Sequence, residues 1–302
     1  MDERKTILAL GYFDGIHLGH AALIRRTAER AAEMDCVPAV LTFDTHPDRF
    51  VKGTAVELLN SAEDRSFILR HFFGVETVYY IHFNAEIMGM DWETFLDRVT
   101  EKYRVAGFVA GFDFRFGSGG AGDAEKLAAF CRERGMSCDV VPPVLLDGET
   151  VRSTRIREKL RQGELAEANA LLGRPHLLTD RVRTGFRLGR TMDFPTVNMR
   201  FEDGVLIPRF GVYAARVLLP DGTLLDGVTN IGMRPTFHGD HVTVETNIFD
   251  FSADLYGQRL AVFFHAFLRP ERPFASPEEL REQIARDAQE ARRVLAAQSE
   301  RL

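Results

Sequence analysis

A glycine-rich turn near the start of the chain constrains the fold more than any other stretch. Residues 11–20 read Gly-Tyr-Phe-Asp-Gly-Ile-His-Leu-Gly-His and follow a short apolar run over residues 6–10. The apolar run is typical of a buried strand, and the amphipathic pattern of residues 21–34 predicts a helix. The turn therefore joins a strand to a helix N-terminus, which is a preferred site for phosphate. His17 and His20 stand at that junction, where they can act on the charge of a bound phosphate.

The first half of the chain alternates predicted strands with predicted helices. Further strands are expected over residues 37–43, 77–82, 106–110 and 138–141, and helices over residues 61–73, 91–103 and 124–134. This rhythm indicates a parallel sheet with helices on both faces. Ligands of such sheets bind beyond the carboxyl ends of the strands, where residues 11–20 and 111–117 both fall.

The second half has a different character, which begins after Gly173-Arg174-Pro175. Alternating runs separated by turn signals predict strands over residues 212–219, 224–231, 241–251 and 258–268. Such strands without intervening helices indicate a small barrel or sandwich. Ser276-Pro277-Glu278-Glu279 predicts the cap of a long final helix that reaches about residue 297. We therefore expect an α/β domain over residues 1–175 and a mainly β domain over residues 176–302.

Composition and charge exclude several classes of protein. A net charge of −6 argues against a general nucleic-acid binder, and the chain has no apolar run long enough to span a membrane. Cys36, Cys131 and Cys138 are too few and too widely spaced for a disulfide framework or a zinc site. Residues 1–5 lead directly into the first strand, so we expect no signal peptide. A cytoplasmic globular protein with small-molecule partners, and with neither nucleic acid nor membrane as partner, is the simplest expectation.

The two histidines of the turn fit chemistry at the α-phosphate of a nucleotide. His17 and His20 are three residues apart, so they share a face of the first helical turn. Gly15 and Gly19 remove side chains where a nucleotide would approach the backbone. An attacking phosphate needs alignment and neutralisation of the equatorial oxygens rather than a protein nucleophile. The alternative is a structural turn with surface histidines, which the completeness of the ten-residue string disfavours.

A second cluster, over residues 151–157, ends a loop and starts a helix. Ser153 or Thr154 can cap that helix and also donate to phosphate. Arg157 can hold the β- and γ-phosphates that leave as pyrophosphate. Taken alone, the cluster is better interpreted as a plain helix cap followed by a basic face.

In the second half, residues 189–198 read Gly-Arg-Thr-Met-Asp-Phe-Pro-Thr-Val-Asn. Thr196 and Asn198 are two apart, so on an extended chain their side chains point the same way. A hydroxyl and an amide carbonyl are oxygen ligands suited to Mg²⁺ that also touches nucleotide phosphates. For an isolated Thr-x-Asn, a solvent-facing position on a strand is the commoner outcome.

Glu245 lies on the predicted strand over residues 241–251 and points away from the more apolar face. A carboxylate there can take the proton from a primary alcohol as the alcohol attacks a γ-phosphate. An exposed strand glutamate is the alternative, and it is the commoner fate of glutamate in a sheet.

The first half resembles the adenylyltransferase module of the prokaryotic bifunctional riboflavin kinase/FMN adenylyltransferases (FAD synthetases). Four motifs carry the resemblance, and they lie at residues 11–20, 43–47, 111–117 and 153–157. Thr45 replaces the family's proline and Arg152 replaces its first serine. The resemblance implies a Rossmann-like nucleotidyltransferase domain in which His17 and His20 are catalytic. It further implies a nucleotide site formed by Gly11, Phe13, Asp14, Gly15, Gly19, His46, Asp113, Ser153, Thr154 and Arg157.

The second half is similar to the riboflavin kinase module of the same family. The matching strings are Phe-Pro-Thr-Val-Asn at 194–198, Val244-Glu245, Asp-Leu-Tyr-Gly at 254–257, and the stretches 227–232 and 268–271. Val197 replaces alanine, and Asp193 stands where the family often has glycine. This likeness implies a small antiparallel β-barrel with a long C-terminal helix. It also implies that Gly189, Thr196 and Asn198 bind MgATP, with Thr196 and Asn198 at the metal, and that Glu245 activates the ribityl 5′-hydroxyl.

Three functions follow from the sequence. The first is a two-step enzyme that uses ATP and Mg²⁺ to convert riboflavin to FMN and then FMN to FAD. The second is a riboflavin kinase whose adenylyltransferase domain is inactive because of Arg152. The third is a flavin-binding module without catalysis, which the presence of Glu245, Thr196, Asn198, His17 and His20 disfavours.

Overall fold

The computed structural model describes residues 4–44, 56–183, 196–236 and 239–298. The chain divides into two compact units, of which the first contains residues 1–58 and 65–152 and the second contains residues 59–64 and 153–302. Residues 153–175 thus group with the second compact unit. The division into functional domains at residue 175 stays a prediction.

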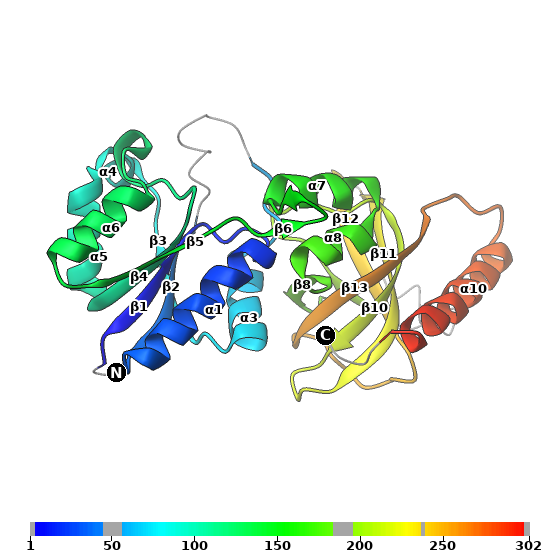
Figure 1. Ribbon diagram of the computed structural model, residues 1–302. Helices are drawn as coiled ribbons and strands as arrows, with labels where there is room; N and C mark the ends of the chain where they lie inside the picture. The colour runs from blue at the N-terminus through cyan, green and yellow to red at the C-terminus, as the bar shows by residue number, and fades with distance from the viewer. Residues whose placement is uncertain (1–3, 45–55, 184–195, 237–238, 299–302) are drawn as a thin grey trace. The chain divides into compact units, whose positions relative to one another are not determined.

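The first unit is built on a parallel five-stranded sheet in the order β3-β2-β1-β4-β5 (Figure 1). The strands are β1 (Thr6–Leu10), β2 (Val37–Phe43), β3 (Thr77–Ile81), β4 (Val105–Gly111) and β5 (Ser137–Val141). The helical segments are α1 (Leu18–Glu33), α3 (Ala62–Phe73), which begins in the second unit, α4 (Ala85–Gly89), α5 (Trp92–Tyr103), η1 (Ser118–Gly120) and α6 (Ala124–Glu133). The expected parallel sheet with flanking helices is confirmed.

Helices cover both faces of this sheet because its central strands are apolar on both sides. All five residues of β1 are buried. Helix α1 contacts β1, β2 and β4, while α5 and α6 pack against β4. Leu8, Leu10 and Phe108 share a core with apolar residues of α5 and α6. The carboxyl ends of β1 and β4 are then the places where polar loops meet ligands, as in other open parallel sheets.

The second unit is an antiparallel sheet of six strands in the order β8-β13-β10-β11-β12-β9. The strands are β8 (His176–Arg181), β9 (Thr196–Met199), β10 (Gly211–Leu218), β11 (Leu224–Thr236), β12 (Gly239–Ile248) and β13 (Arg259–Pro270), and the helices are α7 (Ser153–Gln162), α8 (Leu165–Leu172) and α10 (Pro277–Ala296). A bridge between Arg183, just beyond β8, and Asn198 of β9 joins the two end strands. The curled sheet confirms the small antiparallel barrel.

The long C-terminal helix α10 packs on the barrel strands β10, β11 and β13 (Figure 1). Ser276 caps it by accepting a hydrogen bond from the backbone N–H of Glu279, as expected from the sequence. Ala291 and Leu295 of the helix share a core with Val212 on β10. Among the described residues, no helix combines the length and the apolar character needed to cross a membrane.

Some elements differ from expectation. Helix α1 begins at Leu18 rather than at residue 21, which makes His17 its N-cap residue. The short helix α4, the hairpin of β6 (Leu145–Leu146) and β7 (Glu149–Thr150), and strand β8 were not expected. The first two are too short for periodicity to reveal. β8 follows the Gly-x-Pro boundary, and its place in the sheet depends on pairing with β13, which is distant in the chain.

Candidate functional site

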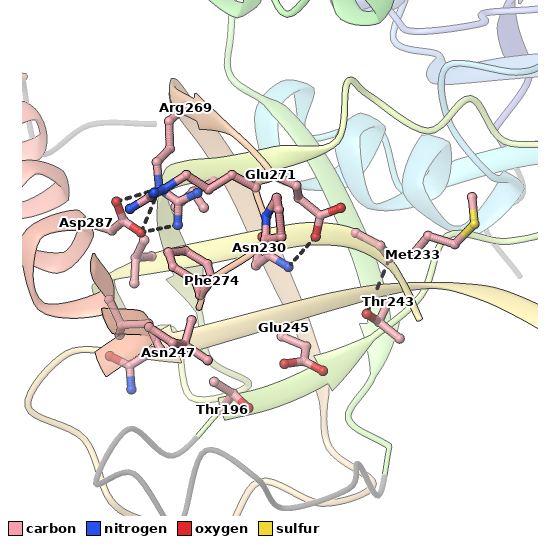
Figure 2. A pocket seen from close by; sticks show the side chains of 17 residues that line it. Thr196, Asn230, Met233, Thr243, Glu245, Asn247, Arg269, Glu271, Phe274 and Asp287 are labelled. Carbon is pink, nitrogen blue, oxygen red and sulfur yellow. Dashed lines mark hydrogen bonds and ion pairs between the residues drawn. The ribbon is translucent and has the colours of Figure 1, made fainter. Parts of the chain in front are cut away.

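A cavity of about 520 Å³ opens on one face of the barrel sheet. Its floor is formed by β9, β11 and β12, which contribute Thr196, Asn230 and Glu245 among others (Figure 2). Phe274, from the segment that follows β13, and Ile284 of α10 form the opposite wall. The volume and the mixture of apolar walls with a few polar groups are typical of a small-molecule site.

The register of the barrel strands gathers the predicted kinase residues on this face. Glu245 on β12 lies directly opposite Asn198 on β9, and Asn247 lies opposite Thr196. Directly opposed residues of antiparallel strands point to the same face. Val244 and Thr246 are fully buried on the other face, so Glu245 is directed into the cavity as the alternation predicts. Asn198 Nδ2 lies 3.5 Å from the carbonyl oxygen of Thr196.

An ion pair fixes the wall opposite Glu245. Arg269 donates from Nε and Nη2 to the buried carboxylate of Asp287 on α10, and the shortest N–O distance is 2.6 Å. The Arg269 guanidinium also lies over the Phe274 ring, 5.7 Å from its centroid. Two parallel hydrogen bonds between an arginine and a carboxylate fix the relative orientation of the two side chains. The pair therefore fixes α10 against β13 at the cavity edge.

Glu271, directly after β13, lines the cavity and contacts its floor. Asn230 donates to Glu271 Oε1 at 3.2 Å, and Asn230 is also the cross-strand neighbour of Glu245 on β11. A Cβ at Gly232 would lie 1.8 Å from Glu271 Oε1. The absence of a side chain at Gly232 therefore permits the position of Glu271.

In the first unit, the turn after β1 brings the two histidines into contact. His17 is the N-cap residue of α1 and His20 lies in its first turn. Their rings stack with centroids 3.9 Å apart and planes inclined by 18°. The expectation that they share one face of the first helical turn is met by this geometry. Phe13 also packs against His20, with ring centroids 5.2 Å apart and planes inclined by 56°.

The environment of His20 favours a neutral imidazole. Burial, the neighbouring His17 and the cation of Arg65 together lower the pKa of His20 well below its ordinary value. His20 Nδ1 is buried and has no hydrogen-bond partner among the described residues. A neutral ring can donate a hydrogen bond to a phosphate oxygen, but it carries no charge to neutralise it.

The backbone of the turn is unusual in three places. Phe13 and Ile16 have φ values of 56° and 41°, in the left-handed region that bulky residues rarely adopt, and Gly15 has a φ of 80°. The side chains of Phe13 and Ile16 are fully buried. Such backbone persists only where surrounding contacts hold it, and it is often found at functional sites.

If the turn over residues 11–20 is the adenylyltransferase site that the resemblance implies, Gly19→Ala should lower FAD formation about tenfold, because positioning errors of well under an ångström are costly at a reaction centre. A Cβ at Gly19 would lie 3.1 Å from Cε1 of His17, and His17 cannot retreat freely because it is buried and stacked on His20. Alanine is a better helix former than glycine, so the melting temperature should not fall. Rates of FMN adenylylation measured by chromatography check this expectation.

Gly89→Ala is the matched control, because a Cβ at Gly89 meets no atom within 4 Å. That variant should keep the wild-type rate. Equal rates for Gly19→Ala and Gly89→Ala would show that the His17 ring position does not matter.

The remaining predicted nucleotide residues are placed as follows. Asp14 is buried in the turn, and Asp113 is exposed just beyond β4. Ser153, Thr154 and Arg157 lie in the first two turns of α7, in the second compact unit. Their assignment to the nucleotide site stays a prediction. His46 and Gly189 lie outside the described residues.

Sequence reasoning did not single out Asn230, Arg269, Glu271 and Asp287 as site residues. The motif stretches 227–232 and 268–271 contain the first three of them, and that was the available signal. The sequence alone would place the acidic Asp287 on the exposed face of α10. It lines the cavity only because that helix packs on the barrel.

Comparisons with known proteins cover almost the whole chain. Residues 1–155 match a family model described as FAD synthetase, and residues 172–295 match one described as riboflavin kinase. The chain is 34% identical to the bifunctional riboflavin kinase/FMN adenylyltransferase of Listeria monocytogenes, over 97% of this chain and 93% of the relative. It is 35% identical to the Escherichia coli K12 protein of the same name, over 96% of this chain and 93% of the relative.

A solved structure from Streptococcus pneumoniae, described as a macrolide-efflux protein, shares the fold. It has a TM-score of 0.81 and 29% identity, and the match covers 99% of this chain and 96% of that chain. The sequence matches extend across both compact units at more than 30% identity. The chain therefore belongs to the family of bifunctional riboflavin kinase/FMN adenylyltransferases.

Proposed function

We propose that this chain makes FAD from riboflavin in two ATP-dependent steps. In the first, riboflavin is phosphorylated to FMN, and in the second, FMN is joined to AMP with release of pyrophosphate. The observation that carries the proposal is that one chain holds both a stacked histidine pair at a helix N-terminus and a cavity with Glu245 at its floor. Full-length relatives that are named for both activities support it.

For the kinase step, we assign the barrel cavity to riboflavin. Its apolar side chains, such as Val212, Phe274 and Ile284, suit the flat ring system of a flavin. Glu245 takes the proton from the ribityl 5′-hydroxyl while the oxygen attacks the γ-phosphorus of ATP, and the bond to the leaving ADP breaks. The carboxylate keeps that proton until solvent removes it.

For the adenylyl step, we assign the α-phosphate of ATP to the turn over residues 11–20. A phosphate oxygen of FMN attacks the α-phosphorus, and the bond to pyrophosphate breaks without a covalent enzyme intermediate. His17 and His20 donate hydrogen bonds to the equatorial oxygens, and the backbone of the helix start adds further N–H donors. Ser153, Thr154 and Arg157 are proposed to bind nucleotide phosphate, as the family resemblance implies.

Magnesium is part of the proposal. The Thr196 hydroxyl and the Asn198 amide oxygen are hard donors on the same face as Glu245, and this donor set suits Mg²⁺ shared with ATP. When bound, the ion screens the charge of the polyphosphate. We further propose small-molecule partners only and a location in the cytoplasm.

A product time course tests the proposed function. Riboflavin, ATP and Mg²⁺ are incubated with the protein, and flavins are separated by chromatography. FMN should appear first and FAD later. FMN without FAD would favour a kinase with an inactive adenylyltransferase, and bound flavin without ATP consumption would favour a non-catalytic binding module.

A further inference from the structure

Arg65, on α3, is the largest fully buried side chain in the first unit. Its side chain is 1% exposed, although it carries a permanent positive charge. Among the described residues, its hydrogen bonds go to two backbone carbonyl oxygens and one hydroxyl, none of which carries a negative charge, and its Nε is buried without a partner. Burying a charge without a counter-ion costs free energy. A charged side chain at this position is therefore expected to have a specific role.

The guanidinium binds oxygen atoms at the carboxyl ends of two neighbouring strands. Nη1 donates to the carbonyl oxygen of Tyr12 at 2.9 Å and lies 3.0 Å from Oγ1 of Thr42, and Nη2 donates to the carbonyl oxygen of Phe43 at 3.1 Å. Tyr12 follows β1, whereas Thr42 and Phe43 end β2. Arg65 therefore connects the ends of two strands at the sheet edge where ligands bind.

Tyr12 is held from three directions. Its carbonyl also accepts a hydrogen bond from Thr42 Oγ1 at 2.8 Å, and its ring lies 4.8 Å from Cζ of Arg65. The residue after Tyr12 is Phe13, the first position in the turn with a left-handed backbone. Arg65 thus fixes the peptide from which the strained turn starts, and the turn ends at His17 and His20.

The charge of Arg65 also acts on the site. Burial and the neighbouring His17 lower the pKa of His20, and the cation of Arg65 lowers it further because it opposes protonation of the ring. An anion that binds at the imidazoles meets the field of Arg65, which is weakly screened inside the protein. The guanidinium therefore supplies the positive charge that the neutral ring does not.

We infer that Arg65 is a positioning residue for adenylyl transfer, which holds the Tyr12 peptide and the following strained turn in register and adds positive charge beside His20. This inference rests on the proposed role of His17 and His20 in that reaction. It assigns no contact between Arg65 and the substrate.

The test compares two substitutions of one residue. Arg65→Gln removes the positive charge and the pair of Nη groups that bind the two carbonyl oxygens. We expect it to lower kcat for FMN adenylylation about 100-fold, with a smaller change in the KM for ATP. Arg65→Lys keeps the charge but cannot span the two carbonyls with one nitrogen, so we expect a partial recovery, to about tenfold below wild type. Riboflavin phosphorylation by the same samples should be unchanged.

Arg70→Gln is the matched control, because Arg70 lies on the same helix but is exposed, with Glu76 as its ion-pair partner at 3.7 Å. It should keep the wild-type kcat. A merely structural role for Arg65 predicts lower melting temperatures for both Arg65 variants with wild-type kcat in the folded protein, and that result would overturn the inference.

Two further variants keep the test decisive. If Arg65→Gln does not fold, Thr42→Val removes one contact of the same clamp, and it should lower kcat to a smaller extent. Wild-type kcat in both Thr42→Val and Arg65→Lys would overturn the inference. If His20→Ala keeps its adenylylation rate, the proposed site itself fails; if only the Arg65 and Thr42 variants keep theirs, the inference alone fails.

Discussion

Glu245→Gln should strongly reduce riboflavin phosphorylation while FAD formation from supplied FMN continues. The amide keeps the size and shape of the carboxylate but cannot accept the proton of the attacking hydroxyl. Loss of a general base costs about 10²–10⁴-fold in rate, and here we expect a loss in that range in kcat. FMN production from riboflavin and FAD production from FMN, measured on one preparation, check both parts.

The control for this variant is Glu282→Gln on α10. Glu282 is exposed, pairs with Arg286 at 3.5 Å and does not line the cavity. It should leave both rates unchanged. Undiminished FMN production by Glu245→Gln would remove Glu245 from the mechanism, and loss of both reactions in a folded protein would contradict the assignment of two sites.

His20→Ala should have the opposite effect, with FMN adenylylation reduced and riboflavin phosphorylation intact. The substitution removes the hydrogen-bond donor that we propose for the α-phosphate, and it also removes the ring on which His17 stacks. Loss of one donor to a developing negative charge costs about 10²–10³-fold in kcat, and we expect that range here. Single-turnover rates with FMN and ATP measure the chemical step directly.

His71→Ala is the control, because His71 lies on α3 of the same unit, is exposed, and has its ring stacked on Phe67 and edge-on to Phe72. It should form FAD at the wild-type rate. If His20→Ala formed FAD as fast as His71→Ala, the histidine pair would have no part in adenylyl transfer.

Much of the fold could be predicted from local pattern. The bounds of β1 and β2 agree with expectation, because short apolar runs end at Gly11 and at Asp44. Ser276 caps α10 as its sequence indicates. By contrast, β8 could not be recognised, since its strand character depends on pairing with β13, more than 75 residues later.

The candidate sites also contain some residues that local pattern predicts and others that only the tertiary structure brings together. Glu245, Thr196 and Asn198 were found from alternation and motif, and the strand register brings their positions to one face. Asn230, Glu271 and Asp287 join the cavity only when β11, the segment after β13 and α10 come together. No spacing rule connects such residues, because the distances between them are set by the curl of the sheet and by helix docking.

The sequence by itself determined which chemical groups this protein offers and the order in which they occur, because strand and helix periods and short motifs are properties of neighbouring residues. Only the tertiary structure decided that the imidazoles of His17 and His20 stack, that Asp287 holds Arg269, and that Arg65 lies buried beneath Tyr12. These contacts join residues that lie on different elements or depend on a strained turn. They form only when packing of the sheet and its helices excludes water, and no local pattern encodes that packing.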